Sequence, residues 1–288
     1  MQLTKIAFTK HRKKWYLISM MVIVAGLLSM MLQGLHFGID FSGGNMMELE
    51  FTNDPGINSL RTHMEDQSIS YNVQKSGDDR YILRTEELDE KLASELLGGI
   101  RDEYGEVTLQ RDEKVSASIG EELTRNALMA LGIAAILMIA YITFRFEFYF
   151  GIAAVLALLH DVLITVGIFS IFQIEINSAF VAALLTIIGY SINDTIVIFD
   201  RIRENSNRKS KMGILEIVDV SINQTLFRSI TTTAALLLVL LSLFFLGGNT
   251  IRDFVLAMLI GSISGVYSSI FVASPLWIDL TFIKRKKS

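Results

Sequence analysis

Six stretches of the chain are apolar over the roughly 20 residues that a helix needs to cross the hydrocarbon core of a membrane. Between the first two stretches, shorter runs of apolar and polar residues alternate, as in a folded polar domain. This pattern predicts an α-helical membrane protein with six transmembrane helices and one external α+β domain between helices 1 and 2. The stretches are approximately residues 16–35, 127–144, 150–172, 179–199, 225–246 and 254–278.

The region between the first two stretches alternates in four places like half-buried strands and carries two amphipathic helical patterns. Asp54 followed by Pro55 is a helix-start signal, with Asp as the cap and Pro in the first helical position. The order strand, helix, strand, strand, helix, strand predicts a ferredoxin-like domain. The predicted strands are 45–51, 70–76, 80–86 and 107–115, and the predicted helices are 55–67 and 88–105.

Basic residues gather in alternate segments between the apolar stretches, and such segments face the cytoplasm. The opposite short loops contain a single basic residue, Arg252. We therefore expect a multi-pass protein of the cell membrane with both termini in the cytoplasm. The basic residues of the cytoplasmic segments are Lys5, Lys10, Arg12, Lys13, Lys14, Arg145, Arg201, Arg203, Arg208, Lys209, Lys211 and residues 284–287.

The first apolar stretch is longer than the roughly 7–15 residues of a secretory signal core, and no small-residue cleavage site follows it. We interpret it as an uncleaved anchor. The predicted division of the chain is a cytoplasmic N-terminus 1–15, a first transmembrane helix 16–37, an external domain 38–125, transmembrane helices 2–6 within 126–280, and a basic cytoplasmic tail 281–288.

Composition narrows the classes of function. The chain has no cysteine, which excludes disulfides and thiolate-bound metals. Residues 38–125 hold 9 Lys and Arg against 20 Asp and Glu, a net charge of −11, which argues against a nucleic-acid partner. For the basic cytoplasmic clusters we expect two roles, which are to set the orientation in the membrane and to bind anionic lipid head groups. With no metal cluster, nucleophile triad or phosphate loop, we expect no cofactor, no metal and no enzymatic activity.

Four ionisable residues lie inside apolar stretches, namely His160, Asp161, Asp194 and Arg228. A charge near the middle of a bilayer costs roughly 3 kcal/mol on insertion scales, and residues that carry this cost are functional by default. Asp194 and Arg228 lie on successive stretches of opposite direction at similar depth, so a pair between them is expected to lower the cost for both. Polar neighbours suited to complete a network are Asn193, Asn223, Gln224, Ser229 and Thr232.

Two interpretations of these residues compete. One is a fixed ion pair between Asp194 and Arg228 that locks the bundle. The other, which we favour, is a path for protons or cations in which Asp194 changes its protonation as Arg228 moves. Asp161 and His160 would extend such a path. Neighbouring residues on a helix point about 100° apart, however, so these two need not touch each other.

Glycines mark two further segments. The segment FGIDFSGG, residues 37–44, joins the first stretch to the external domain. Its Gly38, Gly43 and Gly44 permit tight turns, and we interpret them, with Asp40, as a coupling hinge. The segment GSISG has Gly261 and Gly265 four residues apart in the last stretch, which favours close packing against another helix.

These segments together resemble the SecF family of protein-export membrane subunits, within the RND superfamily. FGIDFSGG, ALLHDVLI, GYSINDTIVIFDRIREN and SINQTLFRS each match a family segment at the expected place in the chain. The resemblance implies that the chain is one six-helix half, which needs a SecD-like second half and works with the SecYEG channel on a translocating, unfolded polypeptide. It also implies use of the proton motive force, or of sodium in some relatives, with Asp194 and Arg228 on the ion path and FGIDFSGG in coupling.

Three other functions remain open on the sequence alone. An RND-type exporter half for small molecules or lipids would share the same ion path. An intramembrane aspartyl protease would use Asp161 and Asp194 in one water-filled site, although the motifs of that family are missing. A structural scaffold of the translocation channel would need neither residue to titrate.

Overall fold

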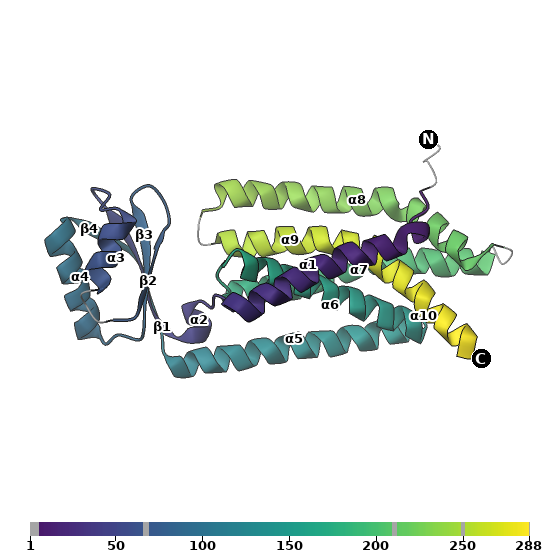
Figure 1. Ribbon diagram of the computed structural model, residues 1–288, viewed down its shortest axis with the longest axis horizontal. Helices are drawn as coiled ribbons and strands as arrows, with labels where there is room; N and C mark the ends of the chain where they lie inside the picture. The colour runs from purple at the N-terminus through teal and green to yellow at the C-terminus, as the bar shows by residue number, and fades with distance from the viewer. Residues whose placement is uncertain (1–5, 66–68, 209–211, 249–250, 288) are drawn as a thin grey trace. The chain divides into compact units, whose positions relative to one another are not determined.

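The computed structural model describes residues 6–65, 69–208, 212–248 and 251–287. It contains two compact units, an α+β unit of residues 37–128 and a helical unit formed by the rest of the chain (Figure 1). The predicted basic residues Lys5, Lys209 and Lys211 lie outside the described residues, and so do the side chains of 284–287.

The predicted fold class is confirmed. Among the described residues, six helical spans are long and apolar enough to cross a membrane, and the α+β unit lies between the first two. The last span is two helices in series, joined by a π-helical turn at Ser269–Ala273. The helices are α1 Arg12–Gln33, α5 Ala117–Arg145, α6 Phe148–Ile171, α7 Ser178–Arg208, α8 Ile214–Leu246, α9 Arg252–Ser268 and α10 Ser274–Lys287.

Pro275 explains the π-helical turn. A proline inside a helix lacks the N–H that would bond four residues back, and its ring clashes with that carbonyl. The wider π turn just before Pro275 avoids the clash, and the Ser274 hydroxyl donates to the Ser269 carbonyl at 2.9 Å. The span therefore bends at this turn and continues as a helix through the bundle.

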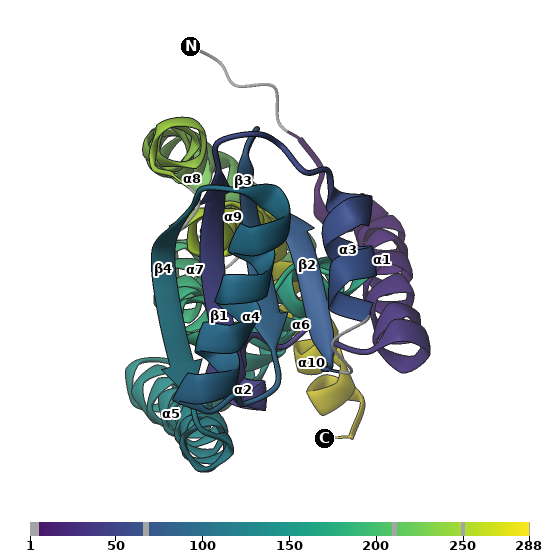
Figure 2. The same ribbon diagram turned by 90° about the vertical axis from the view of Figure 1, so that its left-hand side faces the viewer.

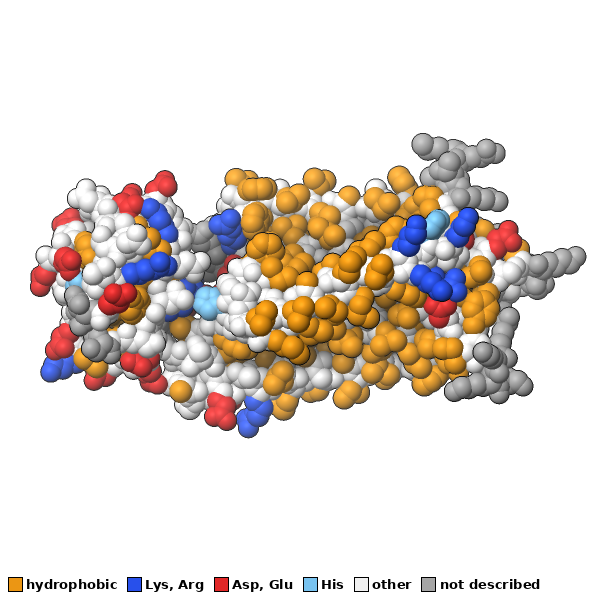
Figure 3. All heavy atoms as spheres, viewed as in Figure 1, with side chains coloured by type: hydrophobic (Ala, Val, Ile, Leu, Met, Phe, Trp, Pro, Cys, Tyr) orange, Lys and Arg blue, Asp and Glu red, His pale blue; other side chains and the backbone are white. Residues whose placement is uncertain are grey.

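The helical unit has a buried centre and apolar outer helices. Half of the most apolar 18-residue stretch is buried in α6 and in α7, and 67% in the α9–α10 span. The corresponding shares for α1, α5 and α8 are 11%, 6% and 17%. Hydrophobic side chains cover the visible face of these helices, while charged ones lie toward the helix ends (Figure 3). An outer surface of this kind suits lipid or another apolar helix, not water.

The α+β unit has the predicted ferredoxin-like topology. Its four strands form one antiparallel sheet in the order β2-β3-β1-β4, and α3 and α4 cover one face of it (Figure 2). Met47, Leu49 and Tyr81 of the sheet pack there with Leu60 of α3 and Ile100 of α4, all at most 3% exposed. The elements are β1 Gly44–Phe51, α3 Ile57–Glu65, β2 Tyr71–Lys75, β3 Arg80–Thr85, α4 Glu90–Tyr104 and β4 Val107–Val115.

The predicted start of the first of these helices is wrong. The helix α3 begins at Ile57, because Gly56 has φ of +76°, which no helix accepts. Asp54 does not cap the helix. Its carboxylate accepts hydrogen bonds from the Gly56 amide at 2.8 Å, from Lys75 Nζ at 2.6 Å and from the Tyr81 hydroxyl. Asp54 therefore ties the β1–α3 loop to the β2–β3 hairpin.

We expect the stability of this unit to depend on the ionisation of Asp54. The hydrogen bonds from Lys75 and Tyr81 lower the pKa of Asp54 to about 2. A carboxylate whose pKa falls on folding stabilises the fold above its unfolded pKa of about 3.9, and this contribution is lost as the pH falls through about 2. Asp54→Asn should therefore loosen the unit at neutral pH, and this effect should shrink toward zero as the pH falls below about 4 and through about 2.

A cysteine placed at the buried Val73, in the otherwise cysteine-free chain, would measure this loosening through its rate of reaction with dithiodipyridine. The variant should react faster than the parent at neutral pH, and the two rates should converge as the pH falls from about 4 to about 2. Asp102→Asn, an exposed substitution on α4, is the matched control. Equal rates for Asp54→Asn and the parent at neutral pH would contradict the prediction.

Candidate functional site

Asp194 lies on the side of α7 that faces α8, and only 8% of it is exposed. The polar groups that act on its carboxyl come from α8, namely the Ser229 hydroxyl and the Arg228 guanidinium. Yet Asp194 Oδ2 and Ser229 Oγ are both buried without a hydrogen-bond partner among the described residues. Buried polar atoms are nearly always paired, so an unpaired carboxyl oxygen inside a membrane helix calls for an explanation.

The predicted ion pair between Asp194 and Arg228 is not formed in the described part of the chain. Arg228 is exposed, and it lines a pocket of about 260 Å³ between α7 and α8 together with Asp200 and Glu204. Helical side chains lean toward the N-terminus of their own helix. Since α7 and α8 run in opposite directions, the side chains of Asp194 and Arg228 lean away from each other. A similar expected depth in the membrane therefore did not predict a contact between them.

The polar residues expected to join Asp194 and Arg228 are bonded elsewhere. Asn223 contacts the backbone of Ile6, and Gln224 Oε1 accepts from Asn205 Nδ2 at 3.0 Å. Thr232 donates to the carbonyl of Arg228 at 2.9 Å, within its own helix, and Asn193 is exposed. Only Ser229 is placed beside Asp194, so the predicted single network is wrong.

The pocket beside Arg228 has its carboxylates already matched. Asp200 pairs with Arg203 at 2.9 Å and with Arg145 at 3.3 Å. Glu204 pairs with Arg201 at 2.7 Å. Among the charged residues lining this pocket, Arg228 is the one with no ion pair to any described residue. Its guanidinium is therefore free to exchange partners.

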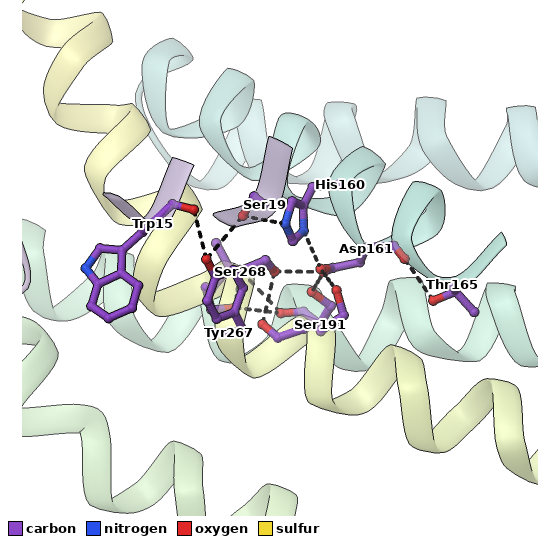
Figure 4. A network of polar contacts seen from close by, with 12 residues as sticks. Trp15, Ser19, His160, Asp161, Thr165, Ser191, Tyr267 and Ser268 are labelled. Carbon is purple, nitrogen blue, oxygen red and sulfur yellow. Dashed lines mark hydrogen bonds and ion pairs between the residues drawn. The ribbon is translucent and has the colours of Figure 1, made fainter. Parts of the chain in front are cut away.

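Asp161 has the opposite environment. It is 1% exposed, and serine hydroxyls from two other helices donate to its carboxylate (Figure 4). Ser191 of α7 donates to Oδ2 at 2.6 Å, and from α9 Ser264 donates to Oδ1 at 2.6 Å and Ser268 to Oδ2 at 2.8 Å. The carboxylate of Asp161 thus joins α6, α7 and α9 at the centre of the bundle.

His160 completes this cluster, and it does contact Asp161, which helix geometry alone left open. Its Nδ1 lies 3.0 Å from Asp161 Oδ1, and its Nε2 lies 3.0 Å from Ser19 Oγ of α1. The chain of polar contacts continues from Ser19 to the Tyr267 hydroxyl at 3.2 Å and from there to the Trp15 carbonyl at 3.0 Å (Figure 4). It links α1 to the centre of the bundle.

The glycines of GSISG lie where α9 packs on α7. A Cβ at Gly261 would lie 2.3 Å from Ile187 Cδ1, and one at Gly265 would lie 2.9 Å from Ser191 Cβ. This close approach brings Ser264 within reach of Asp161. The glycines therefore set the α7–α9 spacing at which Ser191 of α7 and Ser264 of α9 reach the same carboxylate.

The segment FGIDFSGG forms a packed turn at the start of the α+β unit. Residues Ile39–Ser42 make one helical turn, α2, with Asp40 in it, and Gly38 precedes that turn. Gly43 and Gly44 have φ of +73° and +124°, and a Cβ at Gly44 would lie 2.3 Å from the Thr85 carbonyl oxygen. Both positions require glycine. A hinge motion there stays a prediction.

The described residues contain no group of three or more His, Asp and Glu side chains that could hold a metal ion. The carboxyl of Asp194 is buried and incompletely bonded, which are the properties that a proton-exchanging group in a membrane helix needs. Sequence reasoning located Asp194 and Arg228 but missed the hydrogen bonds from serines to Asp161, which cannot be inferred until the helices are packed.

Comparison with known proteins extends over nearly the whole chain. The C-terminal model of the protein export membrane proteins SecD/SecF matches residues 99–282, and the SecD/SecF GG motif matches residues 28–55. The SecF protein translocase subunit of Sebaldella termitidis is 41% identical over 93% of this chain and 89% of its own length. That of Desulfurispirillum indicum is 42% identical over 94% of this chain and 90% of its own length.

Two solved structures are similar as well. A crystal structure of SecDF, a translocon-associated membrane protein from Thermus, superposes with a TM-score of 0.91 at 34% identity, covering 98% of this chain. A second SecDF, in a super-membrane-facing form, gives 0.75 at 33% identity over the whole chain. In both cases this chain spans only 40% of the SecDF chain. By its sequence matches and its fold, the chain belongs to the SecF branch of the SecD/SecF family of protein-export membrane proteins.

Proposed function

We propose that this chain is the SecF half of a Sec translocase accessory complex, and that it couples the proton motive force to late steps of polypeptide export. In the alternative form of this proposal, a sodium gradient drives export in place of the proton motive force. This chain spans 40% of the SecDF chains that resemble it, so each of them has room for a SecD-like second half. The SecYEG channel, the exported polypeptide and anionic lipids at the basic loops are the further partners, and both termini are placed in the cytoplasm.

The contrast between two buried aspartates carries the proposal. Asp161 receives hydrogen bonds from Ser191, Ser264 and Ser268 and contacts His160, so protonating it would sacrifice several of these contacts. Asp194 has an oxygen without a partner, so it can gain or lose a proton without dismantling the bundle. We therefore assign proton exchange to Asp194 and the joining of helices to Asp161.

Arg228 provides the response to that exchange. When Asp194 carries a proton, Arg228 stays in the pocket beside Asp200, as in the structure. When Asp194 is ionised, the attraction of a buried carboxylate draws the guanidinium toward it. One proton that crosses 100 mV releases about 2.3 kcal/mol, so larger work on a polypeptide takes several protons.

The exposed side chains of Arg228 and Asn193 support a partner on the α7–α8 face. Uncovered, an arginine and an amide inside a bilayer would both face lipid, which is costly. A second six-helix half that covers this face would shield them and complete the ion path.

Two alternatives lose support from the geometry. An aspartyl protease needs two carboxylates that act on one water, but Asp161 is saturated by serine hydroxyls and separate from the pocket beside Arg228. A pure scaffold gives no reason for the unpaired oxygen of Asp194. An exporter of small molecules or lipids would use the same ion path, and only the cargo assay below separates it from the proposal.

The test is export of a secreted protein into vesicles, with and without an imposed proton gradient, for the wild type and for Asp194→Asn. The amide keeps the shape of the side chain and removes the titration, so the gradient-dependent part of export should fall to background while export without a gradient stays unchanged. Asp102→Asn, the same change at an exposed carboxylate of α4 that does not line the pocket beside Arg228, is the matched control and should leave gradient-driven export unchanged. Unchanged gradient-driven export in Asp194→Asn would favour the scaffold. Repeating the assay with an imposed sodium gradient in place of the proton gradient tests whether sodium is the coupling ion.

A further inference from the structure

The segment of residues 6–16, which we call the N-terminal clamp, binds α8 through two side chains one turn apart. Asp219 accepts from the Thr9 amide at 2.9 Å and from the Thr9 hydroxyl at 2.8 Å. Asn223 accepts from the Ile6 amide at 3.2 Å and donates to the Ile6 carbonyl at 2.8 Å. These two residues hold the backbone of the clamp, independent of the side chains it carries at Ile6 and Ala7.

The clamp is fixed at its other end to α10 and the π-helical turn. Asp279 of α10 accepts from Arg12 Nε at 3.0 Å and from the Tyr16 hydroxyl at 3.1 Å. The rings of Phe8 and Trp15 pack on Phe271, with centroid distances of 5.6 and 4.4 Å. The clamp therefore moves with α1 and α10, and whatever it grips is tied to them.

The helix that the clamp grips carries Arg228 and packs on the bundle chiefly near its own start. Five of its buried residues lie within residues 217–225, around Asp219 and Asn223, whereas only 17% of its most apolar stretch is buried. A pocket of about 370 Å³ lies between the clamp and α8 and is lined by Ile6, Asp219 and Asn223, so a few hydrogen bonds carry the contact. Arg228 follows Asn223 by five residues on a rigid helix, or about 7.5 Å along its axis.

We propose that Asp219 is a positioning residue for Arg228: the N-terminal clamp stays closed through the transport cycle and passes the movement of α8 to α1. This inference rests on the proposed function. A guanidinium that shifts between the pocket and Asp194 drags α8 with it, and the closed clamp converts that shift into a displacement of α1. The chain continues directly from α1 into FGIDFSGG, so a displacement of α1 can reach the α+β unit along the chain.

The chain offers a direct test because it has no native cysteine. Thr9→Cys with Asp219→Cys removes the hydrogen-bonding side chains, and a short bis-methanethiosulfonate crosslinker restores the connection until a reductant cleaves it. Without the crosslinker, gradient-dependent export should fall by about fivefold or more, the size of an ordinary coupling free energy. With the crosslinker it should return to near the wild-type value, and reductant should remove the gain.

Controls separate positioning from folding. Each single-cysteine variant receives the same reagent and should show no recovery, since one thiol cannot bridge. Recovery in an already folded protein is a result that a role in folding alone would not give. The crosslinking yield should also be the same with and without the imposed gradient, because the clamp stays closed.

Three results would overturn the inference: normal gradient-driven export without the crosslinker, loss of export on crosslinking, or a crosslinking yield that falls when the gradient is applied. The first means that the clamp is dispensable, and the other two mean that it must open. A failure of the proposed function would be recognised separately, because it is tested by comparing gradient-driven export of the wild type with that of Asp194→Asn. The yield of the clamp crosslink can be measured whatever the result of that export assay.

Discussion

Replacing Asp161 with alanine is expected to destabilise the helical bundle by about 2 to 5 kcal/mol. The lower figure follows from about 0.6 kcal/mol for each hydrogen bond between membrane helices, counted over the three serines and His160. The higher figure applies because the change leaves the hydroxyls of Ser191, Ser264 and Ser268 buried without their acceptor. The measurement is the shift of SDS-induced unfolding in mild detergent.

Asp194→Asn is the matched control for this prediction, since it also changes a buried aspartate of the bundle. Its stability should stay within about 1 kcal/mol of the wild type, because the Oδ2 atom of Asp194 has no bond to lose. The two variants should thus have different defects. Asp161→Ala should lose stability, and Asp194→Asn should lose gradient-dependent export. If Asp194→Asn lost more stability than Asp161→Ala, Asp194 and not Asp161 would be the residue that joins the helices.

The helices and strands could be predicted because each depends on the pattern of apolar and polar residues within its own segment. The six spans follow from apolar length, and the four strands follow from alternation, as at 45–51 and 107–115. The start of α3 could not be predicted, because Asp54 has a better set of donors in Lys75 and Tyr81 than a helix end offers. Those donors lie more than 20 residues further along the chain, where local rules do not reach.

The candidate site was predictable in its residues but not in its geometry. The cost of burying Asp194 and Arg228 in a membrane singles them out, whatever the fold. Their separation depends on the lean of side chains on antiparallel helices, and the saturation of Asp161 depends on serines 30, 103 and 107 residues away. Serine is common in membrane helices, so these hydroxyls gain meaning only when α6, α7 and α9 are packed together.

Gly167→Leu is expected to displace α1 from α6 and to cost about 1 to 3 kcal/mol. A Cβ at Gly167 would lie 2.9 Å from the Cα of Gly26, and one at Gly26 would lie 2.7 Å from the Cα of Gly167. Each side chain would meet backbone, which cannot rotate away. The helices must therefore separate, and the contact between Ser29 and Ser170, at 2.8 Å, should open with them.

A disulfide between Ser29→Cys and Ser170→Cys reports this separation, because the two hydroxyls face each other and the chain has no other cysteine. Its yield should be high in the parent and low with Gly167→Leu. Gly132→Leu on α5 is the matched control, the same change in a membrane helix where a Cβ meets nothing within 4 Å, and it should leave the yield unchanged. If Gly167→Leu leaves the yield as high as Gly132→Leu does, α1 does not depend on this glycine contact, and other contacts, such as the clamp and the bonds of Ser19 to His160 and Tyr267, hold it in place.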